Sequence, residues 1–299
     1  MLNGHNVVAA EPIADISRVG APTRRNRLVD APNALVDHLV GTARTSTATI
    51  GRSVVLSVAM LRYLVNDIAR GRLPFGEFVQ QAWHLLKVTA VPAILMAIPF
   101  GAVVSVQVGG LVQQVGATSL TGAASGLGII REGAPLAAGL LLGGAAASAI
   151  AADLGARAIR EELDAMRVMG VDPVQRLLVP RLLALLAIAP VLLIVIVTVG
   201  VGSAYAVATG VSDVSRGSFW ASFGAFATTT DLAMAVVKTA VAAVLVAIIA
   251  GLRGLEARGG PRGVADAVNS AVVLSVTMII FSALLLTQLQ TMFLPSRIA

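Results

Sequence analysis

Residues 182–212 read LLALLAIAPVLLIVIVTVGVGSAYAVATGVS, a run that contains no Asp, Glu, Lys or Arg. An α-helix rises about 1.5 Å per residue, so about 20 residues cross a hydrocarbon core about 30 Å thick. The run is therefore long enough to cross a lipid bilayer once. It predicts a transmembrane helix over residues 182–209.

Four further apolar stretches follow the same rule. Charge-free runs cover residues 88–130, 133–152 and 267–296, and residues 232–252 are interrupted only by Lys238. Together they predict spans at about 88–111, 135–154, 232–252 and 268–291. Residues 113–128 are rich in small polar residues and glycine, which predicts an external loop between the first two spans. The predicted fold class is an all-α polytopic membrane protein with five transmembrane helices.

The composition of the whole chain agrees with that class. Of its 299 residues, 57% are hydrophobic, 13% are charged and none is cysteine, and the mean hydropathy is +0.86. A soluble domain has about 25% charged residues. These values argue against an ordinary cytosolic enzyme, a disordered chain and a disulfide-stapled secreted protein.

The meaning of the net charge of +6 depends on where the basic residues lie. With five spans, 18 of the 22 Lys and Arg residues fall on one side, three on the other, and Lys238 inside a span. Loops rich in Lys and Arg face the cytoplasm. The N-terminus is therefore predicted to be cytoplasmic and the C-terminus external. Basic residues sorted in this way, with few aromatic residues, do not indicate a nucleic-acid-binding surface.

The residues before the first span divide into two parts. Residues 1–32 contain Pro12, Pro22 and Pro32 among scattered arginines, and they predict a mobile cytoplasmic tail. Within residues 33–87, apolar residues recur at helical spacing on both sides of Pro74. This pattern predicts amphipathic helices at the membrane interface. The alternative is a small cytosolic helical hairpin packed on the bundle.

Motifs for catalysis and metal binding are missing from the sequence. A P-loop requires a Gly-Lys pair, and neither lysine, Lys87 or Lys238, follows a glycine. The three histidines, His5, His38 and His84, are far from the spacing of a zinc-protease motif, and the lack of cysteine excludes thiolate sites. We therefore predict no catalytic residue and no metal site on this chain.

Four residues inside the spans need their own interpretation. Lys238 is predicted to extend its side chain to the membrane surface, with contact to an anionic lipid head group as the alternative. Gln107 is predicted to bond to a neighbouring helix, with the same head-group alternative. Gly139 and Gly143 form a GxxxG pair, which favours internal helix packing over an interface with a second chain.

The charged segment between the second and third spans, residues 155–181, carries the most information. Arg157/Glu161, Arg160/Asp164 and Asp164/Arg167 are spaced for ion pairs along an exposed helix. Apolar residues form one face of that helix: Leu163, Met166 and Met169. The helix is either a docking element for a cytosolic partner or a solvated linker.

The remainder of this segment predicts a defined turn. Gly170 is suited to end the helix in a left-handed conformation. Asp172 is placed to cap a second short helix that begins at Pro173. Pro180 and Arg181 mark the entry into the third span.

Three ordered motifs resemble one family. EELDAMRVMGVDPVQRLLVPR, residues 161–181, resembles the signature loop of MlaE/YrbE-type permeases, the membrane subunits of Mce-associated ABC lipid transporters. AADLGARAIREE, residues 151–162, resembles the end of that family's second span. GLRGLEARGGPRGVADAVNSAVVLS, residues 251–275, resembles its last cytoplasmic loop. The resemblance covers about residues 71–294, so the permease domain is expected at 88–294, and the wording is most similar to YrbE A-type subunits.

The resemblance implies the function and the partners. It implies a lipid permease in the bacterial inner membrane, paired with a second permease subunit that is either a B-type homologue or a second copy. A cytosolic P-loop ATPase would hold ATP and magnesium, and Mce proteins would lie on the outer side, so this chain would need no cofactor.

The resemblance also assigns roles within residues 155–181, where residues 159–169 match the family's coupling helix. The residues expected to contact the ATPase are Ile159, Glu161, Glu162, Leu163, Asp164, Met166 and Met169. The residues expected to shape the loop are Gly170, Asp172, Pro173, Pro180 and Arg181. Arg167 departs from the family, which often has an acidic residue at this position.

A second class of function stays open on the residues alone: an ion-coupled secondary transporter or channel for an apolar or amphipathic solute. Such proteins usually carry carboxylates inside their spans or repeat their spans internally. No Asp or Glu lies in the interior of the predicted spans, since Asp153 is at the very end of one, and five spans do not divide into equal halves. The sequence therefore favours the lipid permease.

Overall fold

The computed structural model describes residues 51–67 and 75–293. These residues form helices joined by short turns, without a strand among them, so the predicted all-α class is confirmed. The predicted tail, 1–32, lies outside the described residues. Of the predicted amphipathic region 33–87, only residues 51–67 and 75–87 are described, and both parts are helical.

In the described part of the chain, five helical stretches are long and apolar enough to cross a membrane. They are α2 (Phe75–Gln114), the composite stretch Thr118–Ile159, the stretch Val174–Gly210 that contains α7 (Val179–Gly210), α9 (Thr229–Leu255) and α10 (Pro261–Phe293). Two shorter helices connect them, α6 (Glu162–Val168) and α8 (Arg216–Phe226). The predicted number and order of spans are confirmed, and the chain is a multi-pass membrane protein.

The second stretch is built from several helical pieces without an intervening loop. These are η2 (Thr118–Leu120), α3 (Thr121–Gly128), η3 (Ile129–Gly133), α4 (Ala134–Leu141), η4 (Leu142–Ala146) and α5 (Ala147–Ile159). The pieces η3 and η4 are single π-helical turns. Such turns inside α-helices are frequent at functional sites.

The predicted external loop over 113–128 is wrong. The turn is confined to 115–117, where Gly116 has φ +72°, and helix resumes at Thr118. The small residues of α3 are there to pack closely: a Cβ on Gly122 would lie 2.1 Å from the carbonyl oxygen of Phe219 in α8. A composition of glycine, serine and threonine fits a close-packed membrane helix as well as it fits a loop.

The predicted interfacial helix and the predicted first span are parts of one helix. α2 runs without interruption for 40 residues from Phe75 to Gln114. Lys87 does not break it, and its ammonium lies 5.0 Å from the ring centroid of Trp83 one turn earlier. A cation over an aromatic face is attracted by the ring. The boundary between the interfacial part and the membrane part of α2 stays a prediction.

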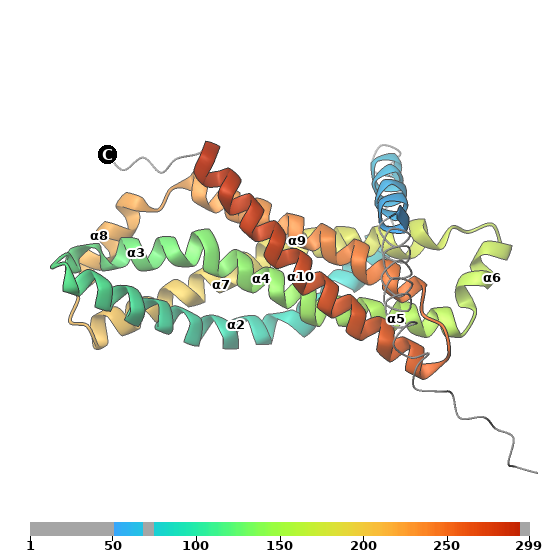
Figure 1. Ribbon diagram of the computed structural model, residues 1–299, viewed down its shortest axis with the longest axis horizontal. Helices are drawn as coiled ribbons and strands as arrows, with labels where there is room; N and C mark the ends of the chain where they lie inside the picture. The colour runs from blue at the N-terminus through green and yellow to red at the C-terminus, as the bar shows by residue number, and fades with distance from the viewer. Residues whose placement is uncertain (1–50, 68–74, 294–299) are drawn as a thin grey trace, which may run out of the picture. The chain divides into compact units, whose positions relative to one another are not determined.

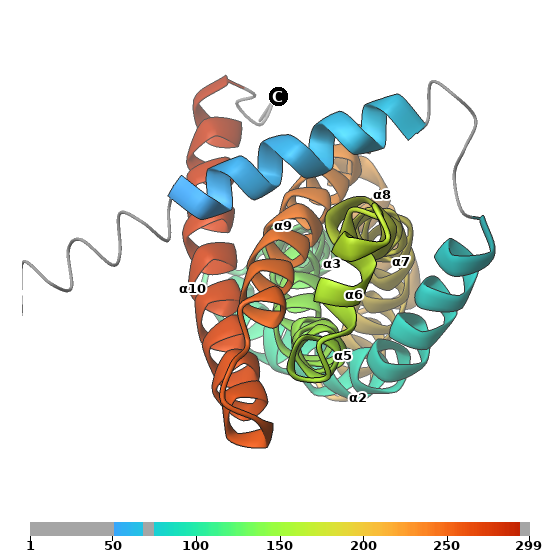
Figure 2. The same ribbon diagram turned by 90° about the vertical axis from the view of Figure 1, so that its right-hand side faces the viewer.

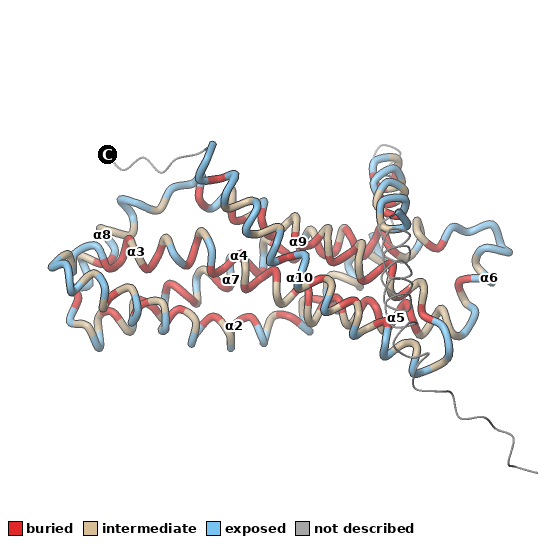
Figure 3. Tube along the Cα trace, viewed as in Figure 1, coloured by how far each residue is buried: buried red, intermediate tan, exposed pale blue. Residues whose placement is uncertain are grey.

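The long helices lie side by side, with the connecting helices at their ends. Figure 1 shows α8 and the start of α3 at one end and α6 at the opposite end. Viewed from the α6 end, α10 lies along one side of the group and α2 along the other (Figure 2). Figure 3 shows that the buried residues follow the inward faces of these helices. The connections between the long helices at the α6 end therefore lie near one another.

α2 and α7 approach each other very closely. A Cβ on Gly101 of α2 would lie 2.1 Å from the carbonyl oxygen of Gly200 in α7. The Ser105 hydroxyl donates to the Ala204 carbonyl oxygen at 2.9 Å, and the Ser203 hydroxyl donates to the Ile98 carbonyl oxygen at 2.8 Å. Small residues and hydroxyl-to-backbone bonds are how membrane helices associate without a hydrophobic driving force.

The GxxxG pair has the predicted internal role. A Cβ on Gly139 would lie 2.8 Å from Ile279 of α10, and one on Gly143 would lie 2.7 Å from the same side chain. Both glycines are buried. They let the second stretch approach α10 within one chain, so the prediction of internal packing is confirmed.

Candidate functional site

The segment between α5 and α7 contains a break that the sequence pattern did not reveal. α5 ends at Ile159, Glu161 adopts a left-handed conformation at φ 59°, and α6 begins at Glu162. The prediction of one helix over 159–169 is therefore wrong. Two of the three predicted ion pairs do not form. Arg157 pairs with Asp153 at 3.3 Å and with Glu162 at 3.7 Å, and Arg160 pairs with Glu162 at 2.8 Å.

The apolar face predicted for this helix is divided by the fold. Leu163 is buried, Met166 is half-buried and Met169 is 71% exposed. Val168, which the sequence analysis did not single out, is 89% exposed. α6 is therefore fixed to the protein through Leu163 and presents Val168 and Met169 to its surroundings.

The charges of α6 lie beside this apolar tip. Asp164 pairs with Arg167 at 2.7 Å, as predicted from their spacing, and both side chains are exposed. Glu162 is engaged by two arginines, whereas Glu161 lies exposed at the turn. Exposed pairs of this kind contribute little to stability. Their arrangement instead gives the surface around Val168 and Met169 a mixed charge.

The second half of the segment has the predicted turn. Gly170 has φ +76°, and the carboxylate of Asp172 accepts the backbone N–H of Val174 at 2.8 Å. Pro173 is buried and is the first helical residue after that cap. The predicted left-handed turn and cap are confirmed.

The entry into the third span is held by a buried arginine. Arg181 is 3% exposed, donates to the Leu177 carbonyl oxygen at 2.8 Å and forms an ion pair with Asp153 of α5. Pro180, also buried, is in the first turn of α7. The two ends of the segment are therefore joined to each other by charge as well as by the chain.

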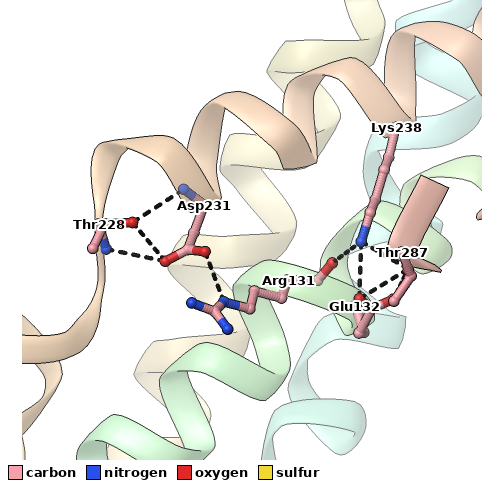
Figure 4. Close-up of polar contacts among 6 residues, drawn as sticks. All are labelled: Arg131, Glu132, Thr228, Asp231, Lys238 and Thr287. Carbon is pink, nitrogen blue, oxygen red and sulfur yellow. Dashed lines mark hydrogen bonds and ion pairs between the residues drawn. The ribbon is translucent and has the colours of Figure 1, made fainter. Parts of the chain in front are cut away.

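A second polar site lies within the membrane helices (Figure 4). Arg131 and Glu132 belong to the π-helical turn η3, and Asp231 and Lys238 lie on α9. Arg131 Nε pairs with Asp231 Oδ1 at 2.7 Å, and Lys238 Nζ pairs with Glu132 Oε1 at 2.8 Å. Two adjacent residues of η3, Arg131 and Glu132, thus pair with residues of opposite charge on α9. Those partners, Asp231 and Lys238, are seven residues apart.

Hydroxyl and carbonyl groups complete this polar site. Thr228 caps α9, and its backbone N–H and hydroxyl both donate to Asp231. Lys238 also donates to the Arg131 carbonyl oxygen at 2.8 Å and to the Thr287 hydroxyl of α10 at 3.0 Å. All three protons of the ammonium are therefore donated to protein atoms.

The structure corrects the interpretation of Lys238. Its side chain is 3% exposed and bonded inside the protein, so the prediction that it extends to the membrane surface is wrong. Direct contact of Lys238 with a lipid head group stays a prediction, and it would require one of the three bonds to be replaced. Gln107 lies exposed on α2, away from this site.

The statement that no carboxylate lies inside the spans is also corrected. Glu132 is within the second stretch and Asp231 is in the first turn of α9. The sequence feature that could have indicated this polar site is the charged pair at 131–132, which lies between two charge-free runs. It suits this site because an ion pair costs much less than a lone charge in a membrane.

The two charge pairs differ in how open they are. The side chains of Asp231 and Lys238 are 4% and 3% exposed, whereas those of Arg131 and Glu132 are 31% and 51% exposed. The α9 partners are therefore enclosed, and the η3 partners are open to an incoming polar group. Among the described residues, no group of three or more His, Asp or Glu is placed to hold a metal ion.

Comparison with known proteins gives a consistent result. Residues 78–289 match the sequence model of the family described as Permease MlaE. A probable ABC transporter permease protein of Synechocystis is 30% identical over 74% of this chain and 84% of its own. The intermembrane phospholipid transport system permease protein MlaE of Haemophilus influenzae is 29% identical over 68% of this chain and 78% of its own. The matched range contains the segment around α6 and the polar site of η3 and α9.

Proposed function

The chain belongs to the MlaE permease family, and from that premise we propose that it is the transmembrane subunit of an ATP-driven lipid transporter. The observation that carries this proposal is the match over residues 78–289, which reaches from the first membrane-spanning helix to the last. The name of the Synechocystis relative gives the ABC transporter class, and the name of the Haemophilus relative gives a phospholipid cargo for that protein. The apolar character of the helices is compatible with a lipid cargo for this chain.

The energy source is proposed to be a separate subunit. This chain lacks the Gly-Lys pair of a P-loop, so a cytosolic ATPase would bind ATP and magnesium and this chain would have neither a cofactor nor a catalytic residue. Val168 and Met169 support α6 as the docking point, because exposed apolar side chains outside a membrane suit a partner's groove. The charged contacts predicted for Glu161, Glu162 and Asp164 would surround that apolar centre.

The orientation and the other partners complete the proposal. The distribution of basic residues supports a cytoplasmic N-terminus and α6 and an external C-terminus, in the bacterial inner membrane. α8 would then be external. A second permease subunit and Mce proteins on the outer side are further proposed partners, from the family resemblance of residues 151–181 and 251–275.

The carboxylates within the membrane helices do not support an ion-coupled transport mechanism. Glu132 and Asp231 are each paired with a cation in the structure, whereas a carrier carboxylate has to exchange its proton or ion during transport. We expect lipid movement in proteoliposomes to require the ATPase and ATP. Movement driven by a proton or sodium gradient without the ATPase would contradict the proposed class.

Docking through α6 is tested by replacing Val168 and Met169 together with aspartate. Both side chains are exposed in the permease, so the replacement should leave its folding unchanged. Burying two such apolar side chains is worth about 3 kcal/mol or more, so affinity for the ATPase should fall at least about a hundredfold. Binding of the purified ATPase to the permease in nanodiscs measures this change.

The matched control is Val211→Asp. Val211 is 74% exposed just after α7, at the end opposite α6, so it receives the same chemical change without affecting α6. It should bind the ATPase with unchanged affinity. Unchanged affinity of the double variant of Val168 and Met169 would contradict the docking assignment.

A further inference from the structure

Three polar contacts join the helical segment 51–67 and the first turn of α2 to the second half of the α5–α7 segment. The Tyr63 hydroxyl donates to the Asp172 carboxylate at 2.6 Å, and the Gln175 amide donates to Asp67 at 2.9 Å. Arg176 pairs with Glu77 at 2.7 Å. Each contact crosses about a hundred residues of sequence, and each ends within residues 172–176.

The partners are well placed to hold that part of the segment. Asp67 is 5% exposed, although it is a carboxylate, and Glu77 is in the first turn of α2. The hydrogen bond to Asp172 raises the pKa of Tyr63, so the phenol remains a proton donor throughout the neutral range. Hydrogen bonds to charged groups are among the stronger ones in proteins.

The helical segment 51–67 is itself anchored. Leu56, Met60 and Leu64 recur on one face and are buried against the rest of the protein. Apolar residues on the opposite face are exposed, including Val55 and Leu61. A helix held on one side by packing can position the groups that project from its end.

The two halves of the α5–α7 segment therefore differ in how they are held. Residues 172–176 carry the three contacts, whereas α6 is fixed mainly by Leu163. Gly170, with φ +76°, separates the two halves. We call residues 172–176 the base of the docking segment; this base is held by residues outside the segment. A displacement of α6 would thus act on a base that is already fixed in place.

We propose that Tyr63, Asp67 and Glu77 are positioning residues that anchor the base of the docking segment, so that movement of α6 is transmitted to α2 as well as to α5 and α7. The chain itself connects α6 only to α5 and α7. The contact of Arg176 with Glu77 adds the start of α2, which packs along α7 through Gly101, and the contacts of Tyr63 and Asp67 add the helical segment 51–67. This inference rests on the proposed function, because it assumes that the ATPase moves α6.

The anchoring is tested first on the permease alone, which makes this measurement independent of the ATPase. The variant combines Tyr63→Phe, which removes one donor, with Asp67→Leu and Glu77→Leu, which remove the two acceptors while keeping side chains of similar size. We expect amide hydrogen exchange over residues 172–178 to become about fivefold faster or more. Unchanged exchange in these residues would overturn the anchoring.

The second measurement uses the permease reconstituted with its ATPase in proteoliposomes. The same triple variant should retain ATPase binding and should transport about fivefold less lipid for each ATP hydrolysed. Lipid transported per ATP that equals the wild-type value would overturn the transmission to α2. If wild-type permease bound no ATPase, the proposed function would fail, and with it the transmission, while the exchange result would still decide the anchoring.

Two control variants separate positioning from general damage. Asp67→Asn keeps an oxygen that accepts from Gln175, so it should restore both exchange and transport when Tyr63 and Glu77 are intact. Ser57→Ala lies on the same helical segment, where its hydroxyl bonds locally to the Ser53 carbonyl oxygen, and it should behave as wild type. Loss of transport in either control would mean that the effect comes from the helical segment as a whole and would contradict the assigned contacts.

Discussion

Lys238→Glu is expected to prevent the permease from accumulating as a folded protein. The new carboxylate would face Glu132 where the ammonium now donates at 2.8 Å, and it would meet the Arg131 carbonyl oxygen as a second acceptor. Breaking a buried ion pair costs about 3–5 kcal/mol, and facing like charges adds to that cost. The amount of protein extracted in monodisperse form, and its thermal unfolding in detergent, measure the loss.

A variant in which both charges are exchanged tests whether the ion pair itself is responsible. Glu132→Lys combined with Lys238→Glu restores opposite charges and should recover part of the lost stability, though not the bond to the Arg131 carbonyl oxygen. Arg216→Glu makes the same charge reversal at an exposed residue of α8 and should have little effect. A Lys238→Glu protein as stable as wild type would refute the structural role of the pair.

Gly101→Val should separate α2 from α7. The new Cβ would lie 2.1 Å from the Gly200 carbonyl oxygen, and that oxygen belongs to the backbone and cannot rotate away. Separation of the helices would also break the bonds made by Ser105 and Ser203. We expect destabilisation of about 3 kcal/mol or more and loss of lipid transport.

Gly110→Val provides the matched control for this change. Gly110 lies on the same helix, and a Cβ there would meet no atom within 4 Å. The substitution has the same effect on helix propensity and hydrophobicity, so it isolates the steric contact. Equal thermal stability of the two variants would show that α2 and α7 do not depend on the close approach at Gly101.

The residues near α6 show which local features could be predicted. The left-handed turn at Gly170 and the cap at Asp172 depend on backbone preferences of a few neighbouring residues, and both were predictable. The break at Glu161 was not, because the spacing of Arg157, Arg160 and Asp164 equally suits a continuous helix. The fold instead directs Arg160 to Glu162, and Arg157 to Asp153 and Glu162.

The composition of residues 113–128 was ambiguous for a physical reason. Small polar residues and glycine disfavour a helix that faces lipid, but they allow a helix to approach another backbone closely. Gly122 beside Phe219 decides between the two, and that contact joins segments about a hundred residues apart. No local pattern could have supplied it.

The sequence by itself determined the number and order of the membrane-spanning helices. It also determined that the segment between the second and third of them is rich in charged residues. Those properties depend on how each stretch partitions between water and lipid, which is a property of the stretch alone. Only the tertiary structure decided that Lys238 is enclosed by Glu132 and Thr287, and that Tyr63 holds Asp172. Ion pairs and close contacts require atoms within a few ångströms of each other, and those distances exist only once the helices have packed.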